Sequence, residues 1–421
     1  MALAAAALAV GCGAKTGLHV PDVDGGEPED MFRPDMRGVD AFVPPPPPDV
    51  CVELPPMTPP KFVDATFLAR IATADVLFLV DVTGSMTDEI DAIRETLRDR
   101  IVPQIASAIP DTQLSVAEFA DFPVSPYGDE SMDVPFQLRQ QSTADIDRVQ
   151  DAVDRLRTRS GSDIPESHVE ALYQSATGAG LGRFVSPGRC PAGTVGYPCF
   201  RTNGSRIILL FTDAAMHNGP GRSEPYDSPP ISPAPATYEM ALGALRDIGA
   251  KVLGLYSGND PRDRALTDLE SIARDTGAVT EDGVPIVLDI GSRGEGLDEG
   301  VVESIRQLVE EVPLDIDAFA EDFPGDEFDA LDFVRSIETT GAVPTGGATD
   351  LGDEYLGVRP GTRVGFRVFL ANERIPRGPE PQSYTLTVVL RGDGVTRLTE
   401  TVVLVVIPSI DGEGCPVDFG P

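Results

Sequence analysis

The stretch "DVLFLVDVTGSM" (75–86) constrains the fold more than any other part of the sequence. Its unbroken apolar run is typical of a buried strand, and the run ends in Asp81, after which hydroxyl side chains follow at Thr83 and Ser85. Apolar residues then recur at helical spacing over 86–104, which predicts a helix directly behind these oxygens. Three small oxygen donors between a buried strand and a helix indicate a cation site.

Strands and helices alternate through the next two hundred residues. The expected strands are "TQLSVAEFAD", "FQLRQQ", "RIILLFTD", "KVLGLYS" and "VPIVLDI", and the expected helices lie near 143–157, 165–177, 237–248, 262–275 and 295–311. This alternation predicts an α/β domain over 61–312, built on a doubly wound, mostly parallel sheet.

The character of the sequence changes from about residue 315. The segments "TRVGFRVFLAN", "SYTLTVVLRGD" and "LTETVVLVVIP" are rich in β-formers and are separated by Gly/Pro turns. They predict an antiparallel β-sandwich over 313–410, followed by a tail over 411–421. Residues 12–60 are rich in Pro and Asp, which indicates a semi-extended tether.

The first residues, "MALAAAALAVGCG", resemble a bacterial lipoprotein signal over 1–11, with Ala9-Val10-Gly11 preceding Cys12. The resemblance implies lipidation of Cys12 and an outer-membrane lipoprotein of the bacterial envelope, facing the periplasm or the surface. No Lys or Arg precedes the apolar run, so an ordinary leader that is cut elsewhere stays as the alternative. The apolar run itself is too short to span a bilayer.

The remaining cysteines are even in number, which suggests two disulfides in an exported protein. Cys190 and Cys199 enclose a short Gly/Pro-rich loop that can bring their sulfurs together. Cys51 and Cys415 would then bracket the folded region. Four cysteines allow three pairings, and the sequence does not choose among them.

Charge and histidine content exclude several classes of function. The chain has 68 acidic and 33 basic residues, a net charge of −35, which argues against nucleic acid or an anionic membrane surface as a direct partner. Membrane contact is therefore expected only through the lipid anchor. Of the three histidines, His19 is in the tether, His168 is in an expected helix, and His217 is expected to pack in a loop. We therefore expect no His-based catalytic apparatus and no enzyme.

A second expected strand, "RIILLFTD", also ends in an aspartate, Asp213. In open α/β sheets the loops beyond the carboxyl ends of the strands converge, so Asp81 and Asp213 should meet there. With Thr83 and Ser85 they form a hard oxygen set that suits Mg²⁺ or Mn²⁺.

These features resemble a von Willebrand factor A domain, whose metal-ion-dependent adhesion site begins D-x-[ST]-x-S. The resemblance is to the I-like domain of integrin β subunits in particular. It rests on "FADFPVSPY" (119–127), "GSDIPESHVEAL" (161–172) and "LLFTDAAMH" (209–217), which occur here in the family's order. Together with the first stretch they cover the core of residues 75–290. The β-rich region after 313 is similar in style to the second half of the integrin hybrid domain. In that comparison "CVELPPMTPPKFVDATFLAR" (51–70) could supply an N-terminal strand, and a Cys51–Cys415 link would tie the two halves together.

The resemblance implies three cation sites. The central site, for Mg²⁺ or Mn²⁺, would be held by Asp81, Thr83, Ser85 and Glu166, with Asp213 close by. The adjacent site, for Ca²⁺, would be held by Asp88 and Glu89. The flanking site, also for Ca²⁺, would be held by Asp121, Asp163, Glu166 and the carbonyl of Pro165. Gly161 stands where the family's flanking site has asparagine.

The function that follows is metal-dependent adhesion. A protein partner would offer an Asp or Glu carboxylate to an open position on the central Mg²⁺. One alternative is a metal-dependent hydrolase that uses Asp81 or Glu166. Another is a purely structural envelope protein whose cations only stabilise it.

Overall fold

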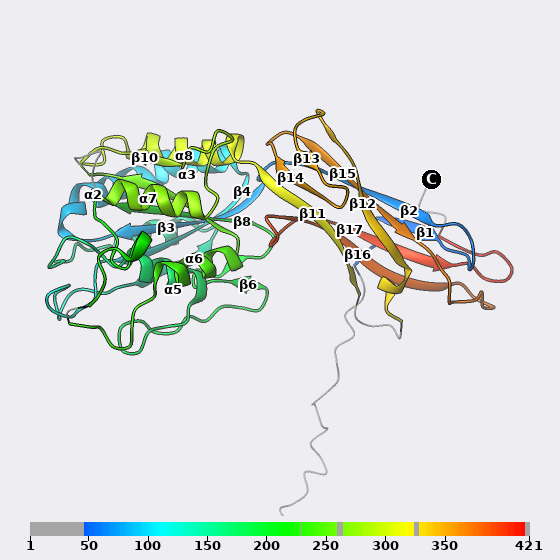
Figure 1. Cartoon of the computed structure of the whole chain (residues 1–421), viewed down its shortest axis with the longest axis horizontal. Helices are drawn as coiled ribbons and strands as arrows, with labels where there is room; N and C mark the ends of the chain where they lie inside the picture. Colours follow the sequence, from blue (N-terminus) through cyan, green and yellow to red (C-terminus); the bar gives the residue numbers. More distant parts are fainter. Residues whose placement is uncertain (1–45, 228, 259–263, 324–327, 417–421) are drawn as a thin grey trace, which may run out of the picture. The chain divides into compact units, whose positions relative to one another are not determined.

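The computed structural model describes residues 46–227, 229–258, 264–323 and 328–416 (Figure 1). The expected signal over 1–11, the lipidation site Cys12 and the tether up to residue 45 lie outside the described residues. None of the described helices is long and apolar enough to cross a membrane.

A six-stranded sheet forms the α/β part, with the strand order β10-β9-β8-β3-β4-β5. Its strands are β3 (Thr73–Asp81), β4 (Asp111–Phe119), β5 (Gln137–Thr143), β8 (Ser205–Thr212), β9 (Ala250–Tyr256) and β10 (Val287–Asp289). All neighbours pair in parallel except β4 and β5, which are antiparallel. The expected α/β class with a mostly parallel sheet is therefore confirmed.

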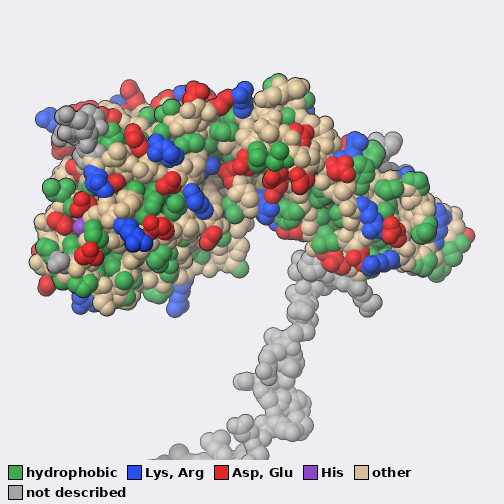
Figure 2. Space-filling view, in the orientation of Figure 1, with side chains coloured by type: hydrophobic (Ala, Val, Ile, Leu, Met, Phe, Trp, Pro, Cys, Tyr) green, Lys and Arg blue, Asp and Glu red, His purple; other side chains and the backbone are tan. Residues whose placement is uncertain are grey.

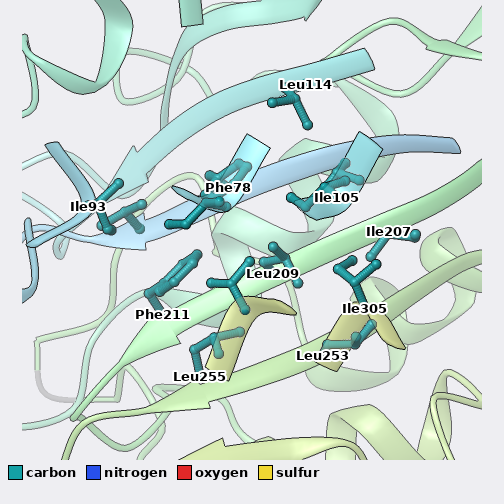
Figure 3. Close-up of a cluster of buried hydrophobic side chains, with 14 of the residues drawn as sticks. Phe78, Ile93, Ile105, Leu114, Ile207, Leu209, Phe211, Leu253, Leu255 and Ile305 are labelled. Carbon is teal, nitrogen blue, oxygen red and sulfur yellow. The ribbon is translucent and has the colours of Figure 1, made fainter. Parts of the chain in front are cut away.

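Helices cover both faces of this sheet (Figure 1). They are α2 (Thr87–Thr96), α3 (Val102–Ala108), α4 (Ile146–Val153), α5 (His168–Thr177), α6 (Tyr238–Asp247), α7 (Arg264–Asp275) and α8 (Leu297–Glu311). Successive side chains of a strand point to opposite faces, so an unbroken apolar strand can serve two cores. In β3, Phe78 packs in the cluster that contains α2, α3, α4 and α8 residues (Figure 3). Leu77 and Leu79 pack in the cluster that contains α5 and α6 residues.

The helix expected over 86–104 is not continuous. After the short turn η2 (Gly84–Met86) and α2, a π-helical turn η3 (Leu97–Ile101) precedes α3. The Val102 N–H donates to the carbonyl of Leu97, five residues back. Pro103 in the first turn of α3 has no N–H to continue the regular pattern, which gives a physical reason for the change of hydrogen bonding at this point.

The second part of the structure consists of two further sheets, with strand orders β1-β17-β16-β11-β14-β13 and β12-β15-β2. Their strands are β1 (Val50–Glu53), β2 (Lys61–Leu68), β11 (Leu314–Asp322), β12 (Val334–Val343), β13 (Thr349–Asp350), β14 (Glu354–Val358), β15 (Arg363–Leu370), β16 (Gln382–Gly392) and β17 (Thr396–Ile407). Side chains from both sheets share one hydrophobic cluster. The pairs are antiparallel except β1 with β17, which is parallel.

Two strands of these sheets come from residues that precede the α/β part. The boundaries predicted from the sequence start the α/β domain at residue 61 and assign residues 50–60 to the tether, with a strand of the sandwich from residues 51–70 as the alternative. In the structure β2 instead pairs with β15, and β1 pairs with β17. The alternation along β2 gives the reason, since Val63 and Ala65 are buried in the shared cluster while their neighbours are exposed.

Both expected disulfides are confirmed. Cys190 and Cys199 are joined with a Cα–Cα distance of 5.3 Å, and Cys51 and Cys415 with one of 6.0 Å. Cys51 lies in β1, so the second bond ties that strand to the segment after β17. Such bonds are typical of proteins outside the cytoplasm.

Figure 2 shows acidic side chains spread over the visible face and interspersed with basic ones.

We predict that Phe78→Ala lowers the free energy of unfolding by about 3–5 kcal/mol, since it leaves a cavity in the core. Phe78 is fully buried and stacks on Phe211 with ring centroids 5.8 Å apart. Met240→Ala on α6 is the control, because Met240 is 48% exposed and its loss should change stability by less than about 0.5 kcal/mol. Urea denaturation followed by circular dichroism measures both, and equal effects would contradict the assigned core.

Candidate metal centre

The carboxylate of Asp81, at the carboxyl end of β3, is fully buried and held by three donors. Its Oδ1 accepts hydrogen bonds from the Thr83 N–H at 2.9 Å and the Thr83 hydroxyl at 2.7 Å. Its Oδ2 accepts one from the hydroxyl of Thr212, the last residue of β8, at 2.7 Å. Parallel pairing of β3 with β8 brings these strand ends together, as expected.

Ser85 and Asp213 complete the outer side of this group. The exposed Ser85 hydroxyl donates to Asp213 Oδ1 at 3.0 Å and lies 3.4 Å from the Thr83 hydroxyl. Asp213 is half-buried and follows β8 directly. The loop after β3 and the end of β8 are therefore linked through hydroxyls, with neutral oxygens between the charged ones.

Glu166 reaches the site from the loop that precedes α5. Its backbone pairs with the segment after β8, through the Glu166 N–H to the Ala215 carbonyl and the His217 N–H to the Glu166 carbonyl, each 2.9 Å. The Glu166 side chain is buried, and its Oε2 has no hydrogen-bond partner. A buried carboxylate oxygen without a partner is costly, and a bound cation removes that cost. The residues present therefore fit a metal ion.

Gly161 lies against this carboxylate. A Cβ at this position would be 2.7 Å from Glu166 Oε1 and 3.3 Å from Thr83 Cγ2, and the residue has a φ of +58°. The backbone conformation and the close approach both favour glycine. An asparagine side chain at position 161 would therefore meet the Glu166 carboxylate.

The electrostatics of the group favour a cation. Burial raises the pKa of Asp81 to about 7, and the Asp213 charge adds to the increase. Burial also raises the pKa of Glu166 to about 12, together with repulsion from Asp81, Asp121, Asp163 and Asp133. The ionised cluster is therefore unfavourable by itself, and positive charge would restore the carboxylate form that ligates metals.

The sequence does not predict two residues that support the central group. Thr212 holds Asp81, and His168 Nε2 lies 2.8 Å from the Thr212 hydroxyl, while His168 Nδ1 lies 3.1 Å from the Glu166 carbonyl. Burial lowers the pKa of His168 to about 3, so its ring is neutral at physiological pH. The signal for Thr212 was its place directly before Asp213 at the strand end. His168 gave no signal, because its contact depends on how α5 packs.

The two residues expected in the adjacent site are placed differently. Glu89 is buried in the first turn of α2, whereas Asp88 is exposed. Glu89 Oε2 has no hydrogen-bond partner, and burial raises the pKa of Glu89 to about 7, with added repulsion from Asp213 and Asp88. A Cβ at Gly294, in the loop before α8, would lie 3.2 Å from the Glu89 Cα, so this loop packs directly on Glu89.

Asp121, Asp163 and His217 form the flanking group, in which each offers a ligand atom within 4.8 Å of the others. No other set of three or more His, Cys, Asp or Glu side chains within the described ranges meets this spacing. Burial raises the pKa of Asp121 to about 7. Burial opposes protonation of His217, but contacts with Asp163 and Asp121 outweigh it and raise the pKa of His217. Pro165, which directly precedes Glu166 in the chain, is half-buried.

The sequence resemblance implies Asp121 and Asp163 as ligands, whereas His217 is expected only to pack in a loop. His217 follows the buried end of β8 by five residues, as the last letter of "LLFTDAAMH". Its position in the same segment, four residues after Asp213, is the available signal in the sequence. The structure adds that its Nε2 faces two carboxylates, 3.2 Å from Asp163 Oδ2 and 3.4 Å from Asp121 Oδ2.

The chain matches no protein-family model and no curated protein sequence. Among solved structures it is similar to a von Willebrand factor type A protein from Catenulispora acidiphila, with 14% identity, a TM-score of 0.36, and coverage of 85% of this chain and 72% of that one. It is also similar to proximal thread matrix protein 1 of the mussel byssus (13% identity, TM-score 0.32, 58% of this chain and 47% of that one).

A third similar structure is the pilus adhesin SpaC from Lactobacillus rhamnosus GG, in its open conformation. Identity is 12% and the TM-score 0.34, over 83% of this chain and 45% of that one. The chain thus spans less than half the length of the last two proteins. Because these TM-scores are low, the α/β assignment rests on the strand order and the packing described above.

We predict that the metal-stripped protein is less stable in mild base than in mild acid. The pKa of Asp81 in the folded state, about 7, exceeds its usual value of 3.8, so the folded state retains a proton that the unfolded chain loses. The proton on Asp81 therefore stabilises the folded state fully below about pH 4, and this stabilisation is lost as the pH rises through about 7. The melting temperature near pH 8 should be at least about 2–4 °C below that near pH 5.5.

Thermal denaturation followed by circular dichroism checks this, and saturating Mg²⁺ should reduce the difference. Asp81→Asn is the control, since it removes the titrating group while keeping an acceptor oxygen. A metal-stripped protein that is more stable at the higher pH would contradict the buried, mutually repelling cluster.

We further predict that Gly161→Ala weakens Mg²⁺ binding by at least about tenfold, the effect of 1.4 kcal/mol, because the new Cβ displaces the Glu166 carboxylate. Gly193→Ala is the matched control, since Gly193 also has a positive φ, +81°, but a Cβ added there would meet no atom within 4 Å. Calorimetric titration gives the Mg²⁺ affinity of both variants. The comparison separates the clash of the new Cβ with Glu166 from the effect of replacing a glycine that has a positive φ. Equal losses of affinity would contradict the placement of Glu166.

Proposed function

We propose that this protein is a metal-dependent binding protein that captures a carboxylate of a protein partner at the carboxyl-end edge of its α/β sheet. The observation that carries the proposal is the group of Asp81, Thr83, Ser85, Glu166 and Asp213. It combines linked hydroxyls and carboxylates with one buried carboxylate oxygen that has no hydrogen-bond partner.

The donor set suits a hard divalent cation, Mg²⁺ or Mn²⁺. When bound, such an ion supplies a Lewis-acidic position to which a partner's Asp or Glu side chain coordinates. Thr83 and Ser85 contribute neutral oxygens, which leave more of the positive charge for that carboxylate. Ser85 is exposed and Asp213 is half-buried, so the outer side of the group is open to a partner.

The chain's own hydrogen bonds would set the geometry of this site. Asp81 is fixed on both oxygens, by Thr83 on one side and Thr212 on the other. Glu166 is fixed through its backbone to the segment after β8. Ligands held this way need little rearrangement on metal binding, which favours affinity.

The integrin-β-like branch is the finer part of the proposal. It is supported by the sequence phrases at 119–127, 161–172 and 209–217 and by the inward position of Glu89. In this interpretation Ca²⁺ binds at Asp88 and Glu89. The two disulfides suit an extracytoplasmic location, and the lipid anchor at Cys12 belongs to the proposal as well.

A metal-dependent hydrolase and a purely structural envelope protein stand as alternatives. A hydrolase needs an accessible acid–base group beside the metal, whereas His168 and His217 are both buried. A structural cation site would need no open coordination position. These two differences make the alternatives separable by experiment.

We predict that the metal-stripped full chain binds Mn²⁺ at a site whose bound water exchanges with solvent and is displaced by carboxylates. The measurement is the relaxation rate of water protons, which bound Mn²⁺ increases. Adding acetate should reduce this increase, because acetate takes the open position, whereas chloride at equal ionic strength should not. Ser85→Ala should weaken Mn²⁺ binding by about tenfold, the effect of 1.4 kcal/mol.

Thr87→Ala is a suitable control, because Thr87 is also an exposed hydroxyl residue but donates to the Gly84 carbonyl rather than to the acidic group. Mn²⁺ binding without any effect of acetate would favour a structural cation. No saturable binding would exclude the proposal as a whole.

A further inference from the structure

One segment of the chain has a charge balance opposite to that of the whole. Residues 171–212 contain no Asp or Glu, although the chain has 68 acidic residues in total. Arg183 and Arg189 are both exposed in this segment, and neither has an acidic partner among the residues that the structure describes. We call residues 178–200 the arginine loop.

The arginine loop lies beside β5, the strand at one edge of the α/β sheet. The Ser142 N–H donates to the Pro198 carbonyl at 2.8 Å, and the Gln141 side chain donates to the Arg189 carbonyl at 3.1 Å. These contacts hold the loop against the last residues of β5. The first residues of the strand, from Gln137, line a pocket instead.

The pocket between the arginine loop and the start of β5 is open and has a volume of about 300 Å³. The aromatic rings of Phe136, Phe184 and Tyr197 line it, together with Gln137 and Leu138. Phe136 is buried, whereas Phe184 and Tyr197 are half-buried and keep ring surface available. Ligand pockets range from about 300 to 1,000 Å³, so a side chain of a partner fits within this one.

Positive charge gathers around this pocket. The guanidinium group of Arg183 lies 4.9 Å from the centroid of the Phe184 ring, on the wall of the pocket. Near the start of β5, the buried Glu118 pairs with Arg139 at 2.6 Å and with Arg159 at 2.7 Å, so two guanidinium groups share one carboxylate. An acidic ligand is therefore favoured by charge, and a cationic one is repelled.

The pocket borders the edge of the sheet at which the central group lies. The ring of Phe184 packs edge-to-face on Phe122, with centroids 5.2 Å apart, and Phe122 belongs to the loop that follows β4. The hydroxyl of Ser167, the residue after Glu166, donates to the Pro135 carbonyl at 2.9 Å, just before Phe136. The walls of the pocket are therefore fixed to the loops of the metal centre.

The register of the sheet gives the reach that a partner needs. Asp81 pairs with Phe119, and Glu118 pairs with Gln137, so two strand spacings of about 4.8 Å each separate β3 from β5 at this level. An extended chain rises about 3.4 Å per residue. A segment of about three to five residues could therefore join the pocket to the central group.

We propose that the arginine loop, the start of β5 and the pocket between them form a docking surface for an acidic, extended segment of a protein partner. The segment places an aromatic side chain in the pocket, because aromatic rings line it. An extended conformation is favoured because an edge strand offers backbone groups for pairing. The inference rests on the proposed function, since the same segment would offer its carboxylate to the central group.

The test is a titration of the full chain with a fluorescein-labelled peptide that has one tyrosine flanked by glutamates, followed by fluorescence anisotropy. EDTA is present, so that no metal contributes, and the salt concentration is low because salt screens exposed charges. We expect saturable binding, weakened about two- to tenfold when serine replaces the tyrosine of the peptide. Replacing the glutamates of the peptide by glutamine should abolish binding.

Charge reversal of both arginines, Arg183→Glu with Arg189→Glu, should weaken binding of the peptide by at least about tenfold. Both side chains are exposed, so the variant should fold, which circular dichroism checks. Arg70→Glu with Arg274→Glu is the matched control, because it makes the same change of charge at exposed arginines before β3 and in α7. Equal losses in the two variants, or no binding to the wild-type chain, would overturn the proposal.

Addition of Mn²⁺ separates this proposal from the proposed function. Mn²⁺ should strengthen peptide binding, and Ser85→Ala should remove only this gain. Peptide binding in EDTA without a gain from Mn²⁺ would support the docking surface and count against the metal-dependent function. Displacement of Mn²⁺-bound water by acetate without peptide binding in EDTA would count against the docking surface alone.

Sedimentation of the full chain tests the other occupant of this surface, a second copy of the chain. Self-association that the Arg183→Glu/Arg189→Glu variant abolishes would assign the surface to acidic segments of that copy. This outcome would overturn the assignment to a separate partner, whereas a wild-type chain that stays monomeric supports it.

Discussion

The arrangement of this protein's candidate sites depends on one costly feature, the burial of several carboxylates at the same edge of a sheet. Asp81 and Asp121 are fully buried and Glu166 nearly so. Hydrogen bonds satisfy both oxygens of Asp81, but each of the other two keeps one oxygen without a partner. Such a group persists only where surrounding packing fixes it or where positive charge compensates it.

The sheet supplies the packing. β3 lies between β4 and β8, with one apolar cluster on each face, so the position of Asp81 is set by buried strands on both sides. The loops that carry the other donors leave from the same edge. Their conformations are then decided by local contacts, such as the close approach of Gly161 to Glu166.

The two groups at this edge differ in access and in chemistry. In the central group Ser85 is exposed and hydroxyls separate the charges, which suits exchange of a ligand with a partner. In the flanking group His217 and Asp121 are buried, and the His217 ring lies against Tyr226 and Tyr127. The proposed function follows this difference, because recognition of a partner requires the open group.

The sequence by itself determined the α/β class, the strand that ends in Asp81, and the meeting of Asp81 with Asp213. Those features follow from hydrophobic periodicity, which is local, and from the rule that the carboxyl ends of parallel strands share one edge of a sheet. The sequence left the pairing of the cysteines open, and the structure joins Cys190 with Cys199 and Cys51 with Cys415. The sequence also did not determine the pairing of β2 with β15, the roles of Thr212 and His168, or the turn of His217 toward Asp121 and Asp163. Only the tertiary structure decided these, because each depends on which distant segment faces a given side of a loop or strand, and the local residue pattern does not name that segment.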